Sequence, residues 1–266
     1  MVTKSLPSHK SQRVLIALLI IVIIAAISVT ELIFAYWSPS LGISLALFFS
    51  LSIYLLVSMT KLGNPFADCA DALVLIPVYI LFTSSLPWFF IDNQLLLPAV
   101  YALILGLCFW YMQSKNISLS NIGFNKNKLI KYILMGIVIG APAGTIEYFV
   151  LRPEPTFPVF TIKYLARDAF YMLFFVALAE EILFRGLIQI KLIPIFGLRW
   201  AIFGQAFIFM VMHLTWRSLP ELGFVFAIGF LLGVIYHRTN SLTAPIVAHG
   251  VGNTMLVAVA PYIFGN

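Results

Sequence analysis

The sequence is poor in charged residues. Only 10% of its 266 residues are Asp, Glu, Lys or Arg, whereas 62% are hydrophobic. Soluble domains carry about 25% charged and about 45–50% apolar residues, so this composition excludes a soluble globular protein. It predicts an all-α, polytopic transmembrane helix bundle. The lipid bilayer that surrounds such a bundle is its first expected partner.

Cysteine is also scarce. The only two, Cys69 and Cys108, lie in or beside apolar runs, which excludes a disulfide framework and a cysteine-based metal site. Both are expected to be small buried hydrophobic residues. The net charge of +6 is interpreted as a signal of membrane topology, and no nucleic-acid partner is expected.

Apolar stretches of about 20 residues, the length that crosses a bilayer, indicate eight or nine spans. The nine candidates are residues 14–36, 41–60, 72–91, 95–113, 130–150, 168–190, 199–215, 220–236 and 243–262. Eight is the alternative, because proline or short connections interrupt 72–91 and the region 199–262. A cytoplasmic N-terminus puts most Lys and Arg residues of the short loops on the cytoplasmic side, as the positive-inside rule requires.

A polar, basic loop at 115–131 divides the chain. Residues 1–114 are expected to be accessory transmembrane helices, because they hold almost no polar chemistry, and 115–266 to be the catalytic part. Gly136, Gly140 and Gly144 recur every fourth residue, a spacing that lets helices pack closely in lipid.

Three charged residues stand inside an apolar stretch: Glu180, Glu181 and Arg185. Each costs about 2.5–3.5 kcal/mol at the centre of a span, so the default interpretation is a functional site. Glu181 and Arg185 are four residues apart, in the favourable order for a pair on one helix face. Glu180 lies about 100° further around the helix and can face another group.

Two histidines also lie in apolar spans. His213 ends the sequence Phe209-Met-Val-Met-His213, and His249 begins His249-Gly-Val-Gly-Asn253. The spacing of four puts Phe209 on the face of His213, and Asn253 on the face of His249. A bundle that hides polar groups from lipid is expected to bring these residues and Glu180 to one interior cavity.

Such a set of groups suits hydrolysis. Glu180 can act as general base on a water molecule with help from His213. His249 and Asn253 can donate hydrogen bonds to an oxyanion, each worth roughly 3–4 kcal/mol. The His-Glu-x-x-His motif of zinc proteases is absent, and no cofactor is expected. A glutamate and two histidines are nevertheless possible zinc ligands, so a metal mechanism stays open at this point.

The sequence contains three further acids near apolar stretches and is compatible with two other functions. Glu31, Glu147 and Asp168 lie near expected span ends, where exposure at the membrane interface is expected. A proton-coupled transporter is an alternative, because intramembrane acids and histidines can relay protons. A non-catalytic immunity or scaffold protein that binds a membrane peptide is another. The lack of a visible internal repeat counts against the transporter.

The three motifs Glu180-Glu181-x-x-x-Arg185, Phe209-x-x-x-His213 and His249-x-x-x-Asn253 occur in this order in one known family. The chain resembles the CAAX-protease and bacteriocin-processing family of intramembrane proteases, which includes type II prenyl-protein endopeptidases and bacterial Abi proteins. The resemblance is specific over about 165–262 and diffuse over 120–165.

The resemblance implies a membrane endopeptidase that acts on a membrane-associated or lipidated peptide or protein. It implies that Glu180 and His213 activate water and that His249 and Asn253 line the oxyanion site. It further implies that Glu181 and Arg185 support the pocket and that the mechanism is of the glutamate type, without a metal. The expected location is a bacterial cytoplasmic membrane.

Overall fold

A computed structural model describes residues 10–84, 93–124 and 128–265, and these residues are mostly helical and contain no strand. The all-α fold is therefore confirmed. Within this part of the chain, eight segments are long and apolar enough to cross a membrane, as expected of an integral membrane protein. They are Lys10–Tyr36, Pro39–Met59, Asn64–Phe82, Leu95–Ser114, Leu129–Leu151, Leu198–Trp216, Leu219–Thr239 and Thr243–Phe264.

Eight of the nine expected spans correspond to these segments. The span expected at 72–91 begins earlier, at Asn64, and its expected end at 85–91 lies outside the described residues. The ninth, expected at 168–190, lies within one unbroken helical run from 162 to 196 that is not among the eight.

The chain forms two compact units. Unit 1 comprises Met1–Phe90, Leu183–Arg217 and Val225–Phe230, and unit 2 comprises Ile91–Ile182, Ser218–Phe224 and Leu231–Asn266. These units are spatial, and the expected functional division between 1–114 and 115–266 stays a prediction.

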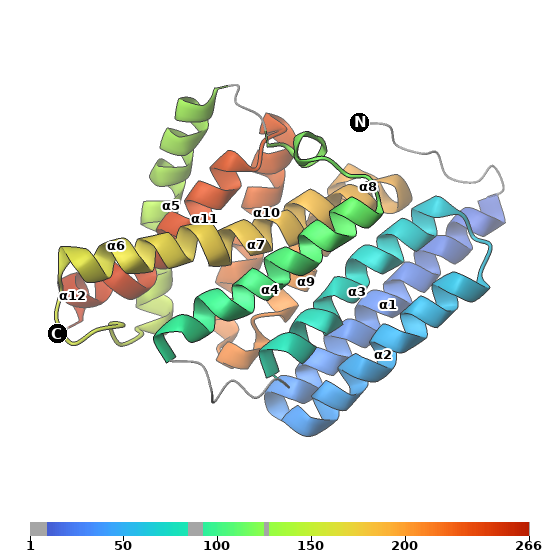
Figure 1. The fold of residues 1–266 in the computed structure, drawn as a ribbon, viewed down its shortest axis with the longest axis horizontal. Helices are drawn as coiled ribbons and strands as arrows, with labels where there is room; N and C mark the ends of the chain where they lie inside the picture. Colours follow the sequence, from blue (N-terminus) through green and yellow to red (C-terminus); the bar gives the residue numbers. More distant parts are fainter. Residues whose placement is uncertain (1–9, 85–92, 125–127, 266) are drawn as a thin grey trace. The chain divides into compact units, whose positions relative to one another are not determined.

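In unit 1, helices α1 (Lys10–Tyr36), α2 (Pro39–Met59) and α3 (Asn64–Ser84) lie side by side (Figure 1). One face of α1 is buried through isoleucines spaced three or four residues apart: Ile16, Ile20, Ile23 and Ile27. Its other face exposes large apolar side chains such as Leu18 and Val22, as a helix in lipid does. The unit also holds α8 (Ile190–Phe196), α9 (Leu198–Val211) and the 3₁₀ turn η5 (Leu214–Trp216).

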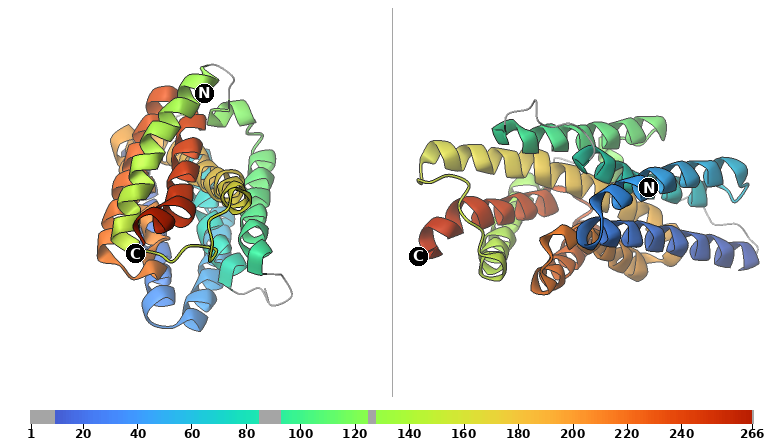
Figure 2. Two further views of the ribbon diagram at one scale, coloured as in Figure 1. Left: turned by 90° about the vertical axis from the view of Figure 1, so that its left-hand side faces the viewer. Right: turned by 90° about the horizontal axis from the view of Figure 1, so that it is seen from below.

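Unit 2 is built around α5 (Leu129–Leu151) and α11 (Thr243–Thr254), which lie against each other (Figure 2). The glycine stripe makes this contact: a Cβ atom at Gly140 would clash with the backbone of Ala248, and one at Gly144 with that of Gly252. The predicted packing role of the stripe is confirmed. Gly250, on α11, in turn lies against Leu173, so α11 also packs on the helix that follows α6.

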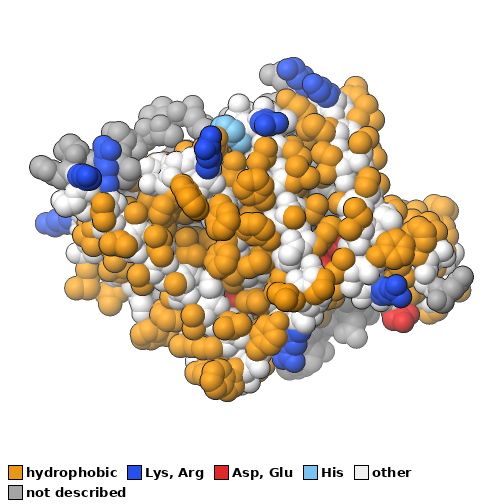
Figure 3. Space-filling model, turned by 180° about the vertical axis from the view of Figure 1, so that it is seen from behind, with side chains coloured by type: hydrophobic (Ala, Val, Ile, Leu, Met, Phe, Trp, Pro, Cys, Tyr) orange, Lys and Arg blue, Asp and Glu red, His pale blue; other side chains and the backbone are white. Residues whose placement is uncertain are grey.

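Unit 2 contains seven further elements. They are α4 (Asn93–Ser114), η2 (Leu119–Ile122), α6 (Ile162–Tyr171), η3 (Met172–Ala177), α7 (Leu178–Glu181), η6 (Met255–Val259) and α12 (Ala260–Phe264). Helix α10 (Leu219–Thr239) contributes residues to both units. Hydrophobic side chains cover most of the face drawn in Figure 3, and Lys and Arg side chains lie toward its margins, in keeping with a bilayer environment.

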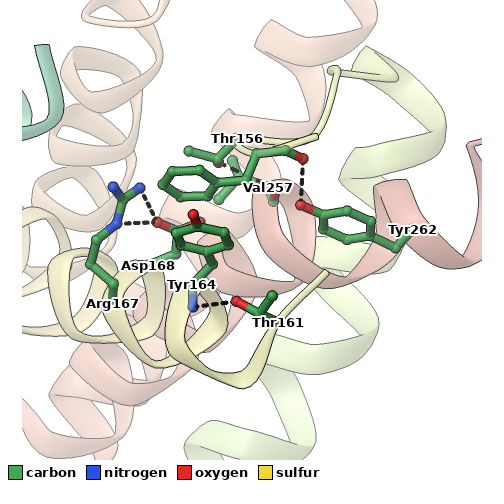
Figure 4. Close-up of polar contacts among 8 residues, drawn as sticks. Thr156, Thr161, Tyr164, Arg167, Asp168, Val257 and Tyr262 are labelled. Atoms are coloured by element: carbon green, nitrogen blue, oxygen red, sulfur yellow. Dashed lines mark hydrogen bonds and ion pairs between the residues drawn. The ribbon is translucent and has the colours of Figure 1, made fainter. Parts of the chain in front are cut away.

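Figure 4 shows polar contacts of α6 and of the connection before it, all within unit 2. Thr161 caps the helix by accepting a hydrogen bond from the Tyr164 backbone N–H, at 3.2 Å. Arg167 donates to Asp168, with Nη2 and Oδ1 2.7 Å apart. The Tyr262 hydroxyl donates to the backbone carbonyl of Phe157 at 2.7 Å, which ties the connection before α6 to the last helix.

Candidate active site

The acidic pair lies on α7, a single turn of α-helix between two π-helical stretches, η3 and η4 (Ile182–Gln189). A π-helical turn accommodates an extra residue and is frequent at functional sites. Glu180 is 5% exposed and Glu181 is 0% exposed, so both carboxyl groups are inside the protein. Burial of this kind requires polar partners.

Glu181 is paired with His249. The distance from its Oε1 to His249 Nδ1 is 2.8 Å. A carboxylate oxygen can only accept, so Nδ1 is the donor and the imidazole is held by a charge-assisted hydrogen bond. Helix α11, positioned by the glycine stripe, brings His249 to this point.

The two carboxylate oxygens of Glu180 have different environments. The Tyr101 hydroxyl, on α4, donates to Oε1 at 2.7 Å. Oε2 lies 3.7 Å from His249 Nε2 and has no hydrogen-bond partner within the described part of the chain. One imidazole therefore faces both acids, with Nδ1 on Glu181 and Nε2 toward Glu180.

Asn253 lies one helical turn beyond His249 on α11 and is partly buried. The predicted shared face of these two residues follows from the helix that the structure shows. In unit 2 the structure thus brings Glu180, Glu181 and His249 together, with Asn253 on the same helix as the histidine.

His213, Phe209 and Arg185 form a second cluster, in unit 1. His213 follows the end of α9 with φ −101° and ψ 7°, and its Nδ1 lies 2.8 Å from the Phe209 carbonyl oxygen. The carbonyl accepts, so Nδ1 carries the proton and the neutral ring has its acceptor lone pair on Nε2. The two rings are 4.8 Å apart, which confirms the expected neighbouring aromatic.

Arg185 is fully buried in this cluster. Its guanidinium lies 4.7 Å from the centre of the Phe209 ring, and its Nη2 donates to the Gly229 carbonyl at 3.1 Å. Gln205 donates to the same carbonyl at 2.9 Å. Arg185 therefore supports Phe209, which in turn holds His213. The expected pairing of Glu181 with Arg185 stays a prediction, as does the convergence of both clusters on one cavity.

Residues 163–255 match the family of Rce1-like type II CAAX prenyl endopeptidases. The match confirms the resemblance seen in the sequence and supports a CAAX-type intramembrane protease at the level of the family. No curated protein and no solved structure matches the chain.

The Rce1-like segment, residues 163–255, contains every residue proposed from the motifs. Tyr101 lies outside it, in the part of the chain that was expected to be accessory, and none of the sequence motifs includes it. The only signal in the sequence is that a tyrosine hydroxyl inside a membrane span requires a hydrogen-bond partner.

Two other acidic residues do not lie where the sequence predicted. Glu31 and Asp168 are buried, so the prediction of interfacial exposure was wrong for both. Asp168 is instead ion-paired with Arg167. Cys69 and Cys108 are free and buried, as predicted. The described residues contain no group of three or more His, Cys, Asp or Glu side chains arranged to hold a metal ion.

Proposed function

We propose that the protein is an intramembrane endopeptidase that hydrolyses a peptide bond of a membrane-associated or lipidated protein or peptide. The observation that carries the proposal is the Glu180 carboxyl group, which is buried beside His249 inside the Rce1-like segment. A buried acid with one oxygen held and the other facing an imidazole suits a general base, because its geometry is fixed before the substrate arrives.

In the proposed reaction, Glu180 takes a proton from water while the water oxygen bonds to the carbonyl carbon of the scissile peptide. His213 assists this proton transfer through Nε2, since its Nδ1 is held by the Phe209 carbonyl. The C–N bond then breaks, and the proton passes to the leaving amine. The products are a carboxyl group and an amine.

His249 and Asn253 are the proposed donors to the oxyanion that forms during attack. His249 already donates from Nδ1 to Glu181, so donation from Nε2 requires a ring that carries both protons. The Glu181 carboxylate compensates the resulting positive charge. This gives Glu181 the supporting role of holding the imidazole, and Arg185 that of holding Phe209.

We propose the glutamate-type mechanism over a metal-type one on the chemistry of the donor atoms. Glu180 Oε1 accepts from Tyr101, and Glu181 Oε1 accepts from His249 Nδ1. Each acid therefore has one oxygen occupied by a protein donor, and the described residues contain no group of three or more His, Cys, Asp or Glu side chains arranged as metal ligands.

The decisive experiment is Glu180→Gln, assayed in proteoliposomes with peptides that carry or lack a farnesyl group. Loss of the general base should lower cleavage by at least about 100-fold. Glu154→Gln, the same substitution at an exposed residue, is the matched control and should cleave normally. Full cleavage by inserted, folded Glu180→Gln protein would refute the assignment. Loss of wild-type activity with a chelator, restored by zinc, would overturn the glutamate-type mechanism alone.

A further inference from the structure

Tyr101 reaches the proposed catalytic acid from outside the Rce1-like segment. It lies on α4, which packs against η3 and α7 in unit 2. Its hydroxyl donates to Glu180 Oε1 at 2.7 Å, a distance typical of a strong hydrogen bond to a carboxylate. The contact joins residues 79 positions apart.

The bond distinguishes two oxygens that are chemically equivalent in a free carboxylate. The terminal torsion of a glutamate is broad and roughly two-fold, so without a fixed donor either oxygen can take either place. With Oε1 held by Tyr101, Oε2 is the oxygen that faces His249 Nε2, at 3.7 Å. Oε2 is also buried and without a hydrogen-bond partner in the described residues.

We propose that Tyr101 is a positioning residue that fixes the Glu180 carboxylate so that Oε2 meets the attacking water. This inference rests on the proposed function of Glu180. A tyrosine suits the task because its rigid ring carries a single hydroxyl at a fixed distance from the helix. Helix α4 is then part of the active-site wall, and the catalytic unit extends beyond the residues that match the family.

The test is Tyr101→Phe, which removes only the hydroxyl group. Losing a hydrogen bond to a charged group should lower kcat about 10- to 100-fold, with little change in KM because no substrate contact is removed. Tyr262→Phe is the matched control, since the Tyr262 hydroxyl makes a bond of the same length, 2.7 Å, to the Phe157 carbonyl. It should retain wild-type kcat.

A double-mutant cycle with Glu180→Asp separates positioning from general destabilisation. The shorter side chain withdraws its carboxylate from Tyr101, so Tyr101→Phe should cost much less in the Asp background than in the wild type. Additive effects, or a Tyr101→Phe variant with wild-type kcat, would overturn the role of Tyr101. If Glu180→Gln is inactive in that case, only the role of Tyr101 fails. If Glu180→Gln cleaves normally, the proposed function itself fails.

Discussion

Each carboxyl group of the acidic pair has its own partner. Glu180 accepts from Tyr101, and Glu181 accepts from His249. We expect Glu181→Gln to lower kcat by about 10-fold, because a neutral amide replaces the charge that strengthens the bond to Nδ1 by about 1–1.5 kcal/mol. Cleavage kinetics of purified protein would measure it. Glu181→Gln protein with the kcat of the Glu154→Gln control would show that the charge on Glu181 does not matter.

The identity of the site residues was predictable, but their contacts were not. Polar residues in apolar spans are conspicuous, and so Glu180, Glu181, His213 and His249 could be selected from the sequence. The bond from His249 to Glu181 joins residues 68 positions apart, and only the packing of α11 decides it. Tyr101 carries no sequence signal that separates it from other tyrosines in spans.

At the level of the elements, the placement of α11 depends on its contact with α5. Gly144→Ala should lower the thermal stability in detergent together with activity, because the added Cβ would meet the Gly252 backbone, which cannot yield without separating the helices. Overpacking of this kind costs about 1–3 kcal/mol. Gly106→Ala, on α4, is the control: open space surrounds that position, and stability should be unchanged or slightly raised. Equal melting temperatures for the two variants would contradict this account.

Elements were predictable where the period of the sequence is that of an α-helix. The stripe of Gly136, Gly140 and Gly144 correctly indicated a tight helix contact. The π-helical stretches η3 and η4 were missed, since their hydrogen bonds skip one more residue and no composition rule marks them. This matters for the site, because residues in a π-helical stretch such as η4 do not recur around the helix axis with the spacing of a regular α-helix.

At the scale of the whole molecule, composition alone was enough to indicate an integral membrane protein of eight or nine spans. Apolar stretches and span length are dictated by the bilayer, so they appear directly in the sequence. The exact count depends on the helical run from 162 to 196, which carries Glu180 and Glu181. Its 35 residues exceed the roughly 20 that a helix needs to cross the hydrocarbon core.

That length predicts that the run is a ninth span, which places the two ends of the protein on opposite sides of the membrane. With a cytoplasmic N-terminus, Lys61→Cys and Arg238→Cys should react with a membrane-impermeant maleimide only from the cytoplasmic side, and Glu154→Cys only from the other. The buried native cysteines Cys69 and Cys108 should give little background labelling.

Arg199→Cys tests the ninth span. Labelling from the same side as Lys61→Cys means that the run crosses the membrane, whereas labelling from the side of Glu154→Cys means that it does not. In the second case the helical run that carries the acidic pair would begin and end on the same side of the membrane, and the expected topology would be wrong.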